Sequence, residues 1–236
     1  MISVVIPAYN EEHTLPLCLQ SLCEQATSLP FEVIVVDNAS TDGTVRQAKK
    51  FAKKLRLRII PESTKGRSPA RRTGFAAASG DTILSTDADT VVPPDWVDNL
   101  IRTLDNGHFS AATGPCRVTD LRPGQNLVLS LFQPTVMICW RLAAGHYWLN
   151  GFNFAIRRDI YLRSGGFNPR LNSLEDVDLS LRVSRIAKIK FTPRIRVVFS
   201  GRRFRRGLAV GLFAYVRSFI DIYIRKKPNS ILPDVR

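Results

Sequence analysis

The sequence predicts an α/β protein built on a mostly parallel, Rossmann-like sheet with helices on both faces. Short apolar segments rich in β-branched residues alternate with amphipathic segments over residues 2–85, the pattern of repeated strand–helix units. The connections between these segments are short, as parallel strands with covering helices require. The chain has 236 residues, 44% hydrophobic and 23% charged, so its composition is that of a globular domain with a sizeable core.

The first half contains four predicted strands and three predicted helices. The strands are short apolar runs, at residues 2–6, 31–36, 57–60 and 81–85. The first helix places apolar residues at helical spacing, namely Leu15, Cys18, Leu19 and Leu22. The second begins after Thr41-Asp42-Gly43, and the third covers residues 68–78 with Pro69 in its first turn.

The second half has a less regular pattern. We expect strands at residues 111–118, 149–156, 188–191 and 196–199. Apolar periodicity predicts helices at 127–144, 175–186 and 207–225. No repeat or long linker divides the chain, so we expect one domain in two parts, residues 1–110 and 111–200, followed by a basic C-terminal part at 201–236.

Positive charge is concentrated near the C-terminus. The chain carries 34 Lys and Arg against 20 Asp and Glu, a net charge of +14. Residues 186–236 contribute 13 of the basic residues and only two of the acids, so most of the excess lies there. This asymmetry predicts an anionic partner such as nucleic acid, phospholipid or a phosphorylated substrate.

Several classes of protein are disfavoured by what the sequence lacks. The four cysteines form no CxxC pair, and with three histidines the chain offers no zinc-finger spacing, so we expect reduced thiols in a cytosolic protein. The N-terminus has no basic region before an apolar run and meets Pro7 early, unlike a signal peptide. The longest uncharged apolar run, residues 127–140, is short for a membrane span and contains Pro134. We therefore expect a soluble or surface-bound protein.

Acidic side chains follow three of the predicted strands. Glu11 follows the first strand, Asp37 the second, and Asp87 and Asp89 the fourth. Since the carboxyl ends of parallel strands meet at one edge, these acids should lie close together and need a cation or hydrogen-bond donors. Alternation along an extended Asp87-Ala88-Asp89 segment places both carboxylates on one side, where hard oxygen ligands suit Mg²⁺ or Mn²⁺ shared with phosphate.

Two further segments carry charges that have both a structural and a chemical interpretation. Gly66 and Arg71 lie around a predicted helix N-terminus, which favours an anion, although Arg71 equally suits holding the acids in place. Glu175 and Asp176 open another helix, where carboxylates stabilise the helix dipole. The alternative is that one of the two is a general base.

Taken together, these motifs resemble the family 2 inverting glycosyltransferases of the GT-A fold. The similarity spans residues 4–178 and rests on several segments in the family's order. They are Val5 to Glu12, Val35 to Thr44, Lys65-Gly66 with Ala70-Arg71, Asp87-Ala88-Asp89, Gly151 to Arg158, and Glu175-Asp176.

The resemblance implies a fold, a reaction and a role for each matching residue. It implies a GT-A domain over 1–200, with a nucleotide-binding half at 1–110 and an acceptor half at 111–200. It implies one sugar moved, with inversion and with Mg²⁺ or Mn²⁺, from a nucleoside-diphosphate sugar to a saccharide or lipid-linked acceptor. The implied nucleotide-binding residues are Pro7, Ala8, Tyr9, Glu11, Asp37, Gly66, Arg71, Asp87, Ala88 and Asp89. The implied metal ligands are Asp89 and Asp87, the base is Asp176, and the sugar or acceptor contacts are Gly151, Asn153 and Glu175.

The chain departs from the family pattern in two places. Many relatives have a late metal-binding histidine, whereas the last one here is His146. Processive synthases have a Gln/Arg-x-x-Arg-Trp motif, whereas the basic run Arg202 to Arg206 has the Arg-x-x-Arg spacing without the tryptophan. We therefore expect non-processive transfer, and some of these arginines could close over the diphosphate. A sugar-nucleotide nucleotidyltransferase and an inactive sugar-nucleotide-binding protein remain alternatives.

The basic C-terminal part predicts contact with a membrane surface. Residues 207–224 are apolar and aromatic, with basic residues at 202–206 before them and at 225–227 after them. Such a helix suits the headgroup region of an anionic membrane at its cytoplasmic face. A core or dimer helix is the alternative. An RNA-binding module is disfavoured because the aromatic residues lie within an apolar helix and do not alternate with basic ones along a groove.

Overall fold

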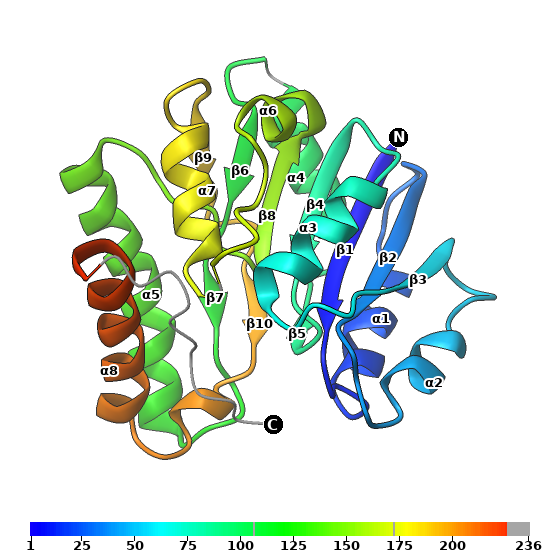
Figure 1. The fold of residues 1–236 in the computed structure, drawn as a ribbon, viewed down its shortest axis with the longest axis horizontal. Helices are drawn as coiled ribbons and strands as arrows, with labels where there is room; N and C mark the ends of the chain where they lie inside the picture. Colours follow the sequence, from blue (N-terminus) through cyan, green and yellow to red (C-terminus); the bar gives the residue numbers. More distant parts are fainter. Residues whose placement is uncertain (106, 172, 226–236) are drawn as a thin grey trace.

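A computed structural model describes residues 1–105, 107–171 and 173–225 (Figure 1). Its centre is a seven-stranded sheet with the order β3-β2-β1-β4-β8-β6-β9. These strands are β1 (Ile2–Ala8), β2 (Phe31–Asp37), β3 (Leu57–Pro61), β4 (Thr82–Thr86), β6 (Ala111–Thr113), β8 (Asn153–Arg157) and β9 (Ile189–Phe191). A second sheet has the order β5-β10-β7, from β5 (Thr90–Val91), β7 (Cys116–Arg117) and β10 (Val197–Phe199).

The first half forms the expected parallel sheet. β1 pairs in parallel with β2 and β4, and β2 pairs in parallel with β3. Val4, Val5 and Ile6 in β1 are fully buried because both faces of the sheet are covered. This arrangement confirms the Rossmann-like half predicted from the alternating apolar segments.

Helices cover both faces of the sheet and form two hydrophobic cores. The first core contains side chains of α1 (Leu15–Cys23), α2 (Thr44–Lys49) and α4 (Trp96–Asp105) with Val4 and Ile6 of β1. The second contains side chains of α3 (Arg67–Ala77), α6 (Arg158–Arg163) and α7 (Glu175–Val183) with Val5 of β1. The alternation of β1 side chains between the two cores follows from the pleat of the strand. α4, α6 and the short β5 were not predicted from the sequence.

The expected strand at 111–118 is divided between the two sheets. β6 ends at Thr113 and β7 begins at Cys116, with Gly114 and Pro115 between them. Pro115 has no amide hydrogen for a ladder, and a Cβ on Gly114 would lie 2.3 Å from Ile195 Cγ1. The chain can therefore leave one sheet and enter the other at this point. The expected strand at 149–156 begins later, at Asn153, because residues 151 and 152 form a turn.

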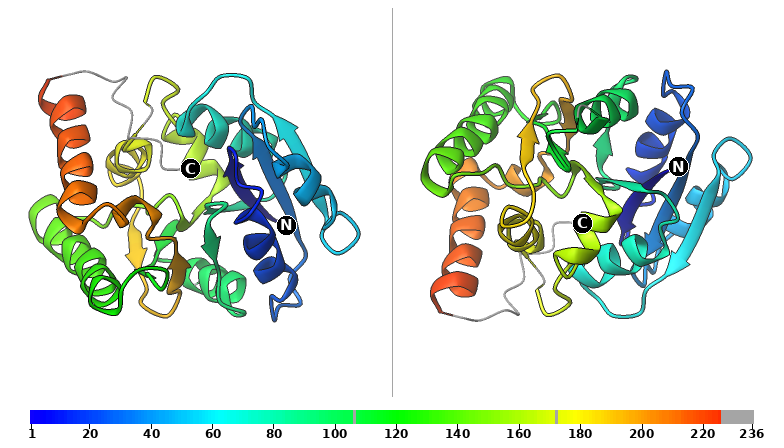
Figure 2. Two further views of the ribbon diagram at one scale, coloured as in Figure 1. Left: turned by 90° about the horizontal axis from the view of Figure 1, so that it is seen from below. Right: turned by 90° about the horizontal axis from the view of Figure 1, so that it is seen from above.

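Two helices lie side by side at the edge of the molecule that is formed by the second half (Figures 1 and 2). They are α5 (Pro123–Ala144) and α8 (Leu208–Phe219), and α8 continues as a π-helical turn, η2 (Ile220–Ile224). A small core that includes Leu129 and Phe204, packed against Leu208 and Leu212, joins the two helices. Lys226 and Lys227 of the predicted basic cluster lie outside the described residues.

The prediction that no segment reaches membrane-spanning length is wrong for α5. The helix continues through Pro134 and is 22 residues long, which corresponds to about 33 Å at 1.5 Å per residue. By length and composition it is able to cross a membrane, as are some core helices and signal sequences. Only Leu129 and Met137 are buried among its residues. The helix starts at Pro123, four residues before the predicted start at residue 127, and Pro134 does not break it.

Candidate active site

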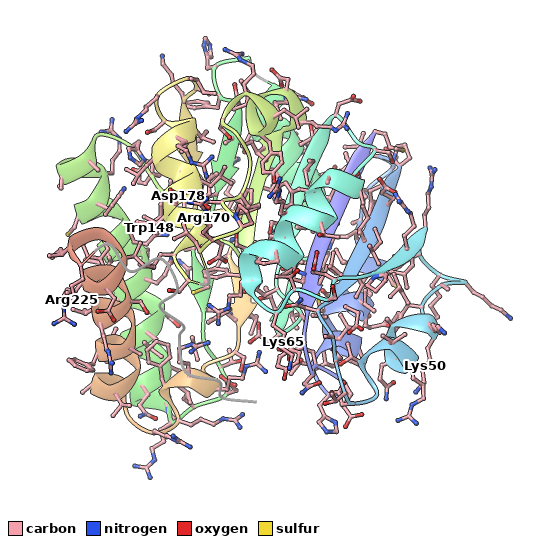
Figure 3. The ribbon with its side chains drawn as sticks, viewed as in Figure 1. Lys50, Lys65, Trp148, Arg170, Asp178 and Arg225 are labelled. Carbon is pink, nitrogen blue, oxygen red and sulfur yellow. The ribbon has the colours of Figure 1, made fainter. Side chains whose placement is uncertain are left out.

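A cavity of about 720 Å³ lies at the carboxyl ends of the parallel strands and extends toward α5, α7 and α8. It is lined by twelve of the fourteen residues predicted for the site. They are Pro7, Ala8, Tyr9, Glu11, Gly66, Arg71, Asp87, Ala88, Asp89, Gly151, Glu175 and Asp176. Lys65 and Trp148, which also line the cavity, lie beside α3 and near α7 respectively (Figure 3).

Arg71 in α3 connects four groups at the centre of this cavity. Its side chain is 3% exposed, and its Nη2 lies 2.7 Å from Asp87 Oδ1. Nη1 donates to the Ser85 hydroxyl at 2.8 Å and to the Gly151 carbonyl oxygen at 2.9 Å, and Nε donates to Glu175 Oε1 at 3.1 Å. The planar guanidinium satisfies all four acceptors in a fixed geometry, which a lysine ammonium could not do.

Gly151 allows this arrangement because it has no side chain. A Cβ at this position would lie 2.5 Å from Arg71 Nη2 and 3.3 Å from Asp176 Oδ2. The backbone N–H of Gly151 donates to Asp176 Oδ2 at 2.9 Å, while its carbonyl oxygen accepts from Arg71. One peptide segment therefore links the Asp87 side of the cavity to the Asp176 side.

The two carboxylates at the start of α7 have different surroundings. Glu175 is buried and paired with Arg71, so its charge is compensated within the protein. Asp176 is half-buried, lines the cavity and has no such ion pair with any residue that the structure describes. Burial, followed by the negative charge of Glu175, raises the pKa of Asp176 to about 6. The hydrogen bond from the Gly151 N–H lowers this pKa but does not outweigh the other two effects. Asp178, two residues further along α7, is engaged by Arg182 at 2.6 Å.

A second arginine neutralises the acids on the other side of the cavity. Arg202 lies in the short 3-10 helix η1 (Arg202–Phe204), just after β10. Its Nη1 donates to Glu11 Oε2 at 2.9 Å, and its Nη2 lies 2.5 Å from Glu11 Oε1 and 2.7 Å from Asp89 Oδ2. Thr14 also donates to Glu11 Oε2, so the Glu11 carboxylate is fully engaged in this structure.

The acid pair has the chemistry of a divalent cation site that needs a further ligand. The Asp89 side chain is 8% exposed. Its pKa is raised to about 6, mainly by burial and further by the charges of Asp87 and Glu11, although the positive charge of Arg202 lowers it. Among the described residues, no group of three or more His, Cys, Asp or Glu side chains is arranged as a metal site. Carboxylate oxygens at Asp87 and Asp89 nevertheless suit Mg²⁺ or Mn²⁺ when phosphate oxygens complete the shell. The donor set fits an ion that is bound together with a diphosphate.

Backbone strain gathers in the loops that border the cavity. Among the described residues other than glycine, Asn10, Ala39 and Leu174 have positive φ, at 52°, 61° and 55°. The first two follow β1 and β2, and Leu174 directly precedes Glu175 and Asp176. Such conformations cost about 1–3 kcal/mol each and persist where the surroundings enforce them, commonly at functional sites.

Two predicted site residues lie outside the cavity lining. Asp37 is half-buried at the end of β2, beside Ala8 in the register, but does not line the cavity. Asn153 is fully buried, so its prediction as a sugar or acceptor contact is wrong. Its side-chain oxygen accepts from Trp96 Nε1 at 2.9 Å, and its nitrogen donates to the Pro115 and Ile195 carbonyls at 3.1 and 2.7 Å. Asn153 is therefore a structural link between the two sheets.

The structure adds residues that the sequence analysis did not single out. Asn38 lines the cavity and holds the following loop, because it accepts from the Gly66 N–H at 2.8 Å and donates to the Glu62 and Thr64 carbonyls. Arg202 was expected only as one of several arginines that could approach a diphosphate. Its pairing with Glu11 spans 191 residues, and the only sequence signal for it was the basic run itself.

Comparison with known proteins relates this chain to glycosyltransferases. The model of the family described as "Glycosyl transferase family 2" matches residues 3–168. An uncharacterized glycosyltransferase of Haemophilus influenzae is 28% identical over 82% of this chain and 64% of its own length. The probable glycosyltransferase YdaM of Bacillus subtilis is 32% identical over 81% of this chain and 49% of its own length. The chain thus spans about half to two thirds of the length of these relatives.

Solved structures show the same fold. S. aureus TarS in complex with UDP has a TM-score of 0.69 at 22% identity, covering 84% of this chain and 60% of TarS. The mannosyltransferase PcManGT of Pyrobaculum calidifontis, in complex with GDP-Man and Mn²⁺, has a TM-score of 0.67 at 24% identity, covering 96% of this chain and 68% of its own. The expected GT-A architecture is confirmed by this similarity. The family match over 3–168 shows that this chain belongs to glycosyl transferase family 2.

Proposed function

We propose that this protein transfers one sugar from a nucleoside-diphosphate sugar to an acceptor oxygen, with inversion at the anomeric carbon. One observation carries the proposal. Arg71 binds both Asp87 and the Gly151 carbonyl, and the Gly151 N–H holds Asp176, so the acid pair and the proposed base face one cavity through a single rigid link. The family membership and the glycosyltransferase names of the relatives support the same reaction.

Asp176 is the proposed general base. Its carboxylate is held by the Gly151 N–H and by the Val177 N–H at 2.8 Å, so it is oriented before substrate binds. An ionised Asp176 would take the proton of an acceptor hydroxyl as the acceptor oxygen attacks the anomeric carbon. Glu175 is paired with Arg71 and would keep that arginine in place.

The opposite end of the cavity is the proposed nucleotide site. Pro7, Ala8, Tyr9 and Gly66 would surround the nucleoside. Asp37, which lies beside Ala8 at the end of β2, is proposed to hydrogen-bond the nucleobase. Asp89 with Asp87 would hold Mg²⁺ or Mn²⁺, which when bound offsets the negative charge of the departing diphosphate. The complex of PcManGT with GDP-Man and Mn²⁺ supports this assignment by analogy.

The acceptor is proposed to be lipid-linked and the protein to work at the cytoplasmic face of a membrane. Over 45–48% of this chain, relatives at 35% and 36% identity are an undecaprenyl-phosphate 4-deoxy-4-formamido-L-arabinose transferase of Photorhabdus laumondii and a dolichol-phosphate mannosyltransferase of Pyrococcus furiosus. Their segments cover only 36% and 30% of those proteins. The exposed apolar residues of α5 and α8 are consistent with a membrane-bound site.

Two carboxylates on one helix provide a test with an internal control. Asp176→Asn should lower the rate of sugar transfer or donor hydrolysis by about 10²–10⁴-fold, the usual contribution of a general base. It should leave binding of UDP or GDP, measured by thermal shift with Mn²⁺, unchanged. Asp178→Asn, which removes only the contact to Arg182, should keep the rate. Transfer retained in Asp176→Asn would remove the base assignment, and no thermal shift with either nucleotide would overturn the proposed activity.

A further inference from the structure

The catalytic cavity has an apolar arm between α5 and α8. Side chains at helical spacing on α5 form one wall, namely Leu129, Phe132, Val136 and Trp140. Leu212, Val216 and Phe219 of α8 form the other wall. Both walls belong to the same cavity that contains Asp87, Asp89, Asp176 and Arg202. The cavity therefore has a charged end and a hydrocarbon-like end, which matches a ligand with the same two parts.

The arm opens toward a surface that is itself apolar. Among the described residues, eleven of the sixteen large hydrophobic side chains that are exposed lie on α5, α8 and η2. Phe132, Val216 and Phe219 are 43%, 55% and 39% exposed, so the mouth of the arm is open at the side of the molecule. Other apolar side chains continue outward from it, such as Leu142 at 80% and Phe213 at 66% exposure. A patch of this kind on a protein marks a site of interaction.

Charge selects a lipid over a second copy of the chain as the occupant of this surface. No charged side chain occurs from residue 123 to 140, while Arg122 and Arg141 lie at the two ends of α5. Arg217 and Arg225 on the α8 side are 70% and 60% exposed and share one acid, Asp221, at 3.7 and 3.0 Å, so one positive charge of the three groups is left over. A second copy would bring the same excess charge against this one, whereas anionic lipid headgroups would neutralise it.

The wall of the cavity contains a buried hydrogen-bond donor, the indole N–H of Trp140, that a ligand could engage. Trp140 Nε1 is buried and has no hydrogen-bond partner among the described residues. The ring of Trp140 packs edge-on against Trp148, with centroids 5.5 Å apart, and Trp148 Nε1 donates to Asn150 Oδ1 at 2.6 Å. A buried indole N–H without an acceptor costs free energy unless a ligand supplies one. A phosphate or hydroxyl oxygen at the head of a lipid would do so.

We infer that the cleft between α5 and α8 binds the hydrocarbon chain of a long-chain lipid phosphate acceptor, whose polar head lies toward Trp140 and Asp176. The inference rests on the proposed function and specifies its acceptor. In the transfer, the bond between acceptor oxygen and anomeric carbon forms as the bond from that carbon to the diphosphate oxygen breaks. The diphosphate keeps the electron pair. The lipid phosphate reacts as its monoanion, and its P–OH proton passes to Asp176.

The test is lipid binding without any sugar nucleotide, so it does not depend on catalysis. Quenching of tryptophan fluorescence by geranylgeranyl phosphate in detergent is compared with isopentenyl phosphate, which has the same head on a five-carbon chain. Val136→Phe on α5 and Val216→Phe on α8 each place a larger side chain in the cleft, one from each wall. Leu142→Phe and Val210→Phe make the same kind of change at exposed positions outside the cavity lining, at 80% and 56% exposure.

We expect the long-chain phosphate to bind at least tenfold more tightly than the short one. Each cleft-filling variant should weaken that binding tenfold or more, while the two outward variants should not change it. Equal affinity for both phosphates, or equal effects of the inward and outward variants, would overturn the inference. Donor hydrolysis measured on the same variants keeps the two proposals apart. A wild type that hydrolyses the donor but shows no chain-length preference fails only the inference about the cleft. A wild type without donor hydrolysis fails the proposed function.

Discussion

Arg202 Nη2 lies 2.7 Å from Asp89 Oδ2, so an arginine of the basic C-terminal part neutralises the second carboxylate of the Asp87–Asp89 pair. The same guanidinium group holds both oxygens of Glu11. Arg71 plays the corresponding part for Asp87 and Glu175. Four acids of the cavity, Glu11, Asp87, Asp89 and Glu175, are thus held by two arginines that come from distant parts of the chain.

Arg202→Gln should destabilise the protein and expose Asp89 to other cations. Glu11 and Asp89 are 3% and 8% exposed, so leaving them without a cation should cost about 3 kcal/mol of unfolding free energy in urea denaturation. Mn²⁺ titrated without nucleotide and followed by electron paramagnetic resonance should bind more tightly, since Arg202 no longer competes for Asp89. Arg205→Gln is the control, because Arg205 is 65% exposed and its ion pair with Asp120 is long, at 3.7 Å. Unchanged stability in Arg202→Gln would contradict the pairing.

Arg71→Lys should impair turnover although it keeps the positive charge. An ammonium group cannot reach Asp87, Glu175, Ser85 and the Gly151 carbonyl together, so at least one buried acceptor is left without a donor. We expect a loss of at least tenfold in kcat/KM and about 3 kcal/mol of unfolding free energy. Arg72→Lys, at the exposed neighbouring position, should change neither quantity. Similar values for both variants would show that Arg71 acts only through its charge.

Gly151→Ala should disturb the link between Arg71 and Asp176. The added Cβ would lie 2.5 Å from Arg71 Nη2, so the guanidinium or the peptide must move. The cost should be about 1–3 kcal/mol of stability, as for other overpacked sites, and the displaced base should lower kcat by more than tenfold. Gly124→Ala, where a Cβ meets no atom within 4 Å, is the matched control. A fully active Gly151→Ala enzyme would argue against the rigid link.

The pH dependence should report the ionisation of Asp176. Since its pKa is raised to about 6 and the base must be ionised, kcat/KM should fall as the pH is lowered below about 6. The unfolded chain has the ordinary pKa of about 3.9, so the native state binds more protons between pH 4 and 6. Ionisation of Asp176 therefore lowers stability as the pH rises through this range. Asp176→Asn should have a Tm at pH 7.5 that equals or exceeds that of the wild type. An acid limb near pH 4, or a clearly less stable variant, would contradict the raised pKa.

Local patterns in the sequence were enough for the parallel half of the fold and for most of the site. Buried strands have apolar runs, helices have a 3.6-residue period, and acids after β1 and β4 follow from the common edge of the sheet. These features depend on neighbouring residues only. They placed Glu11, Asp87 and Asp89 together, while the choice of Asp176 came from the resemblance to the family. All four residues line one cavity.

Contacts between distant segments decided what the sequence alone could not. Asn153 has the residue type of a ligand-binding side chain, but its amide is used to join Pro115, Ile195 and Trp96. Pro134 suggested a break, yet α5 passes through it. A proline removes one hydrogen bond of its own helix, and whether the helix continues depends on the rest of the fold. Periodicity and spacing in this sequence determined the parallel strands β1 to β4, most of the helices and the acids at the strand ends, but not α4, α6 or β5. Only the tertiary structure decided which arginine neutralises which acid, because Arg71 and Arg202 reach them across 104 and 191 residues.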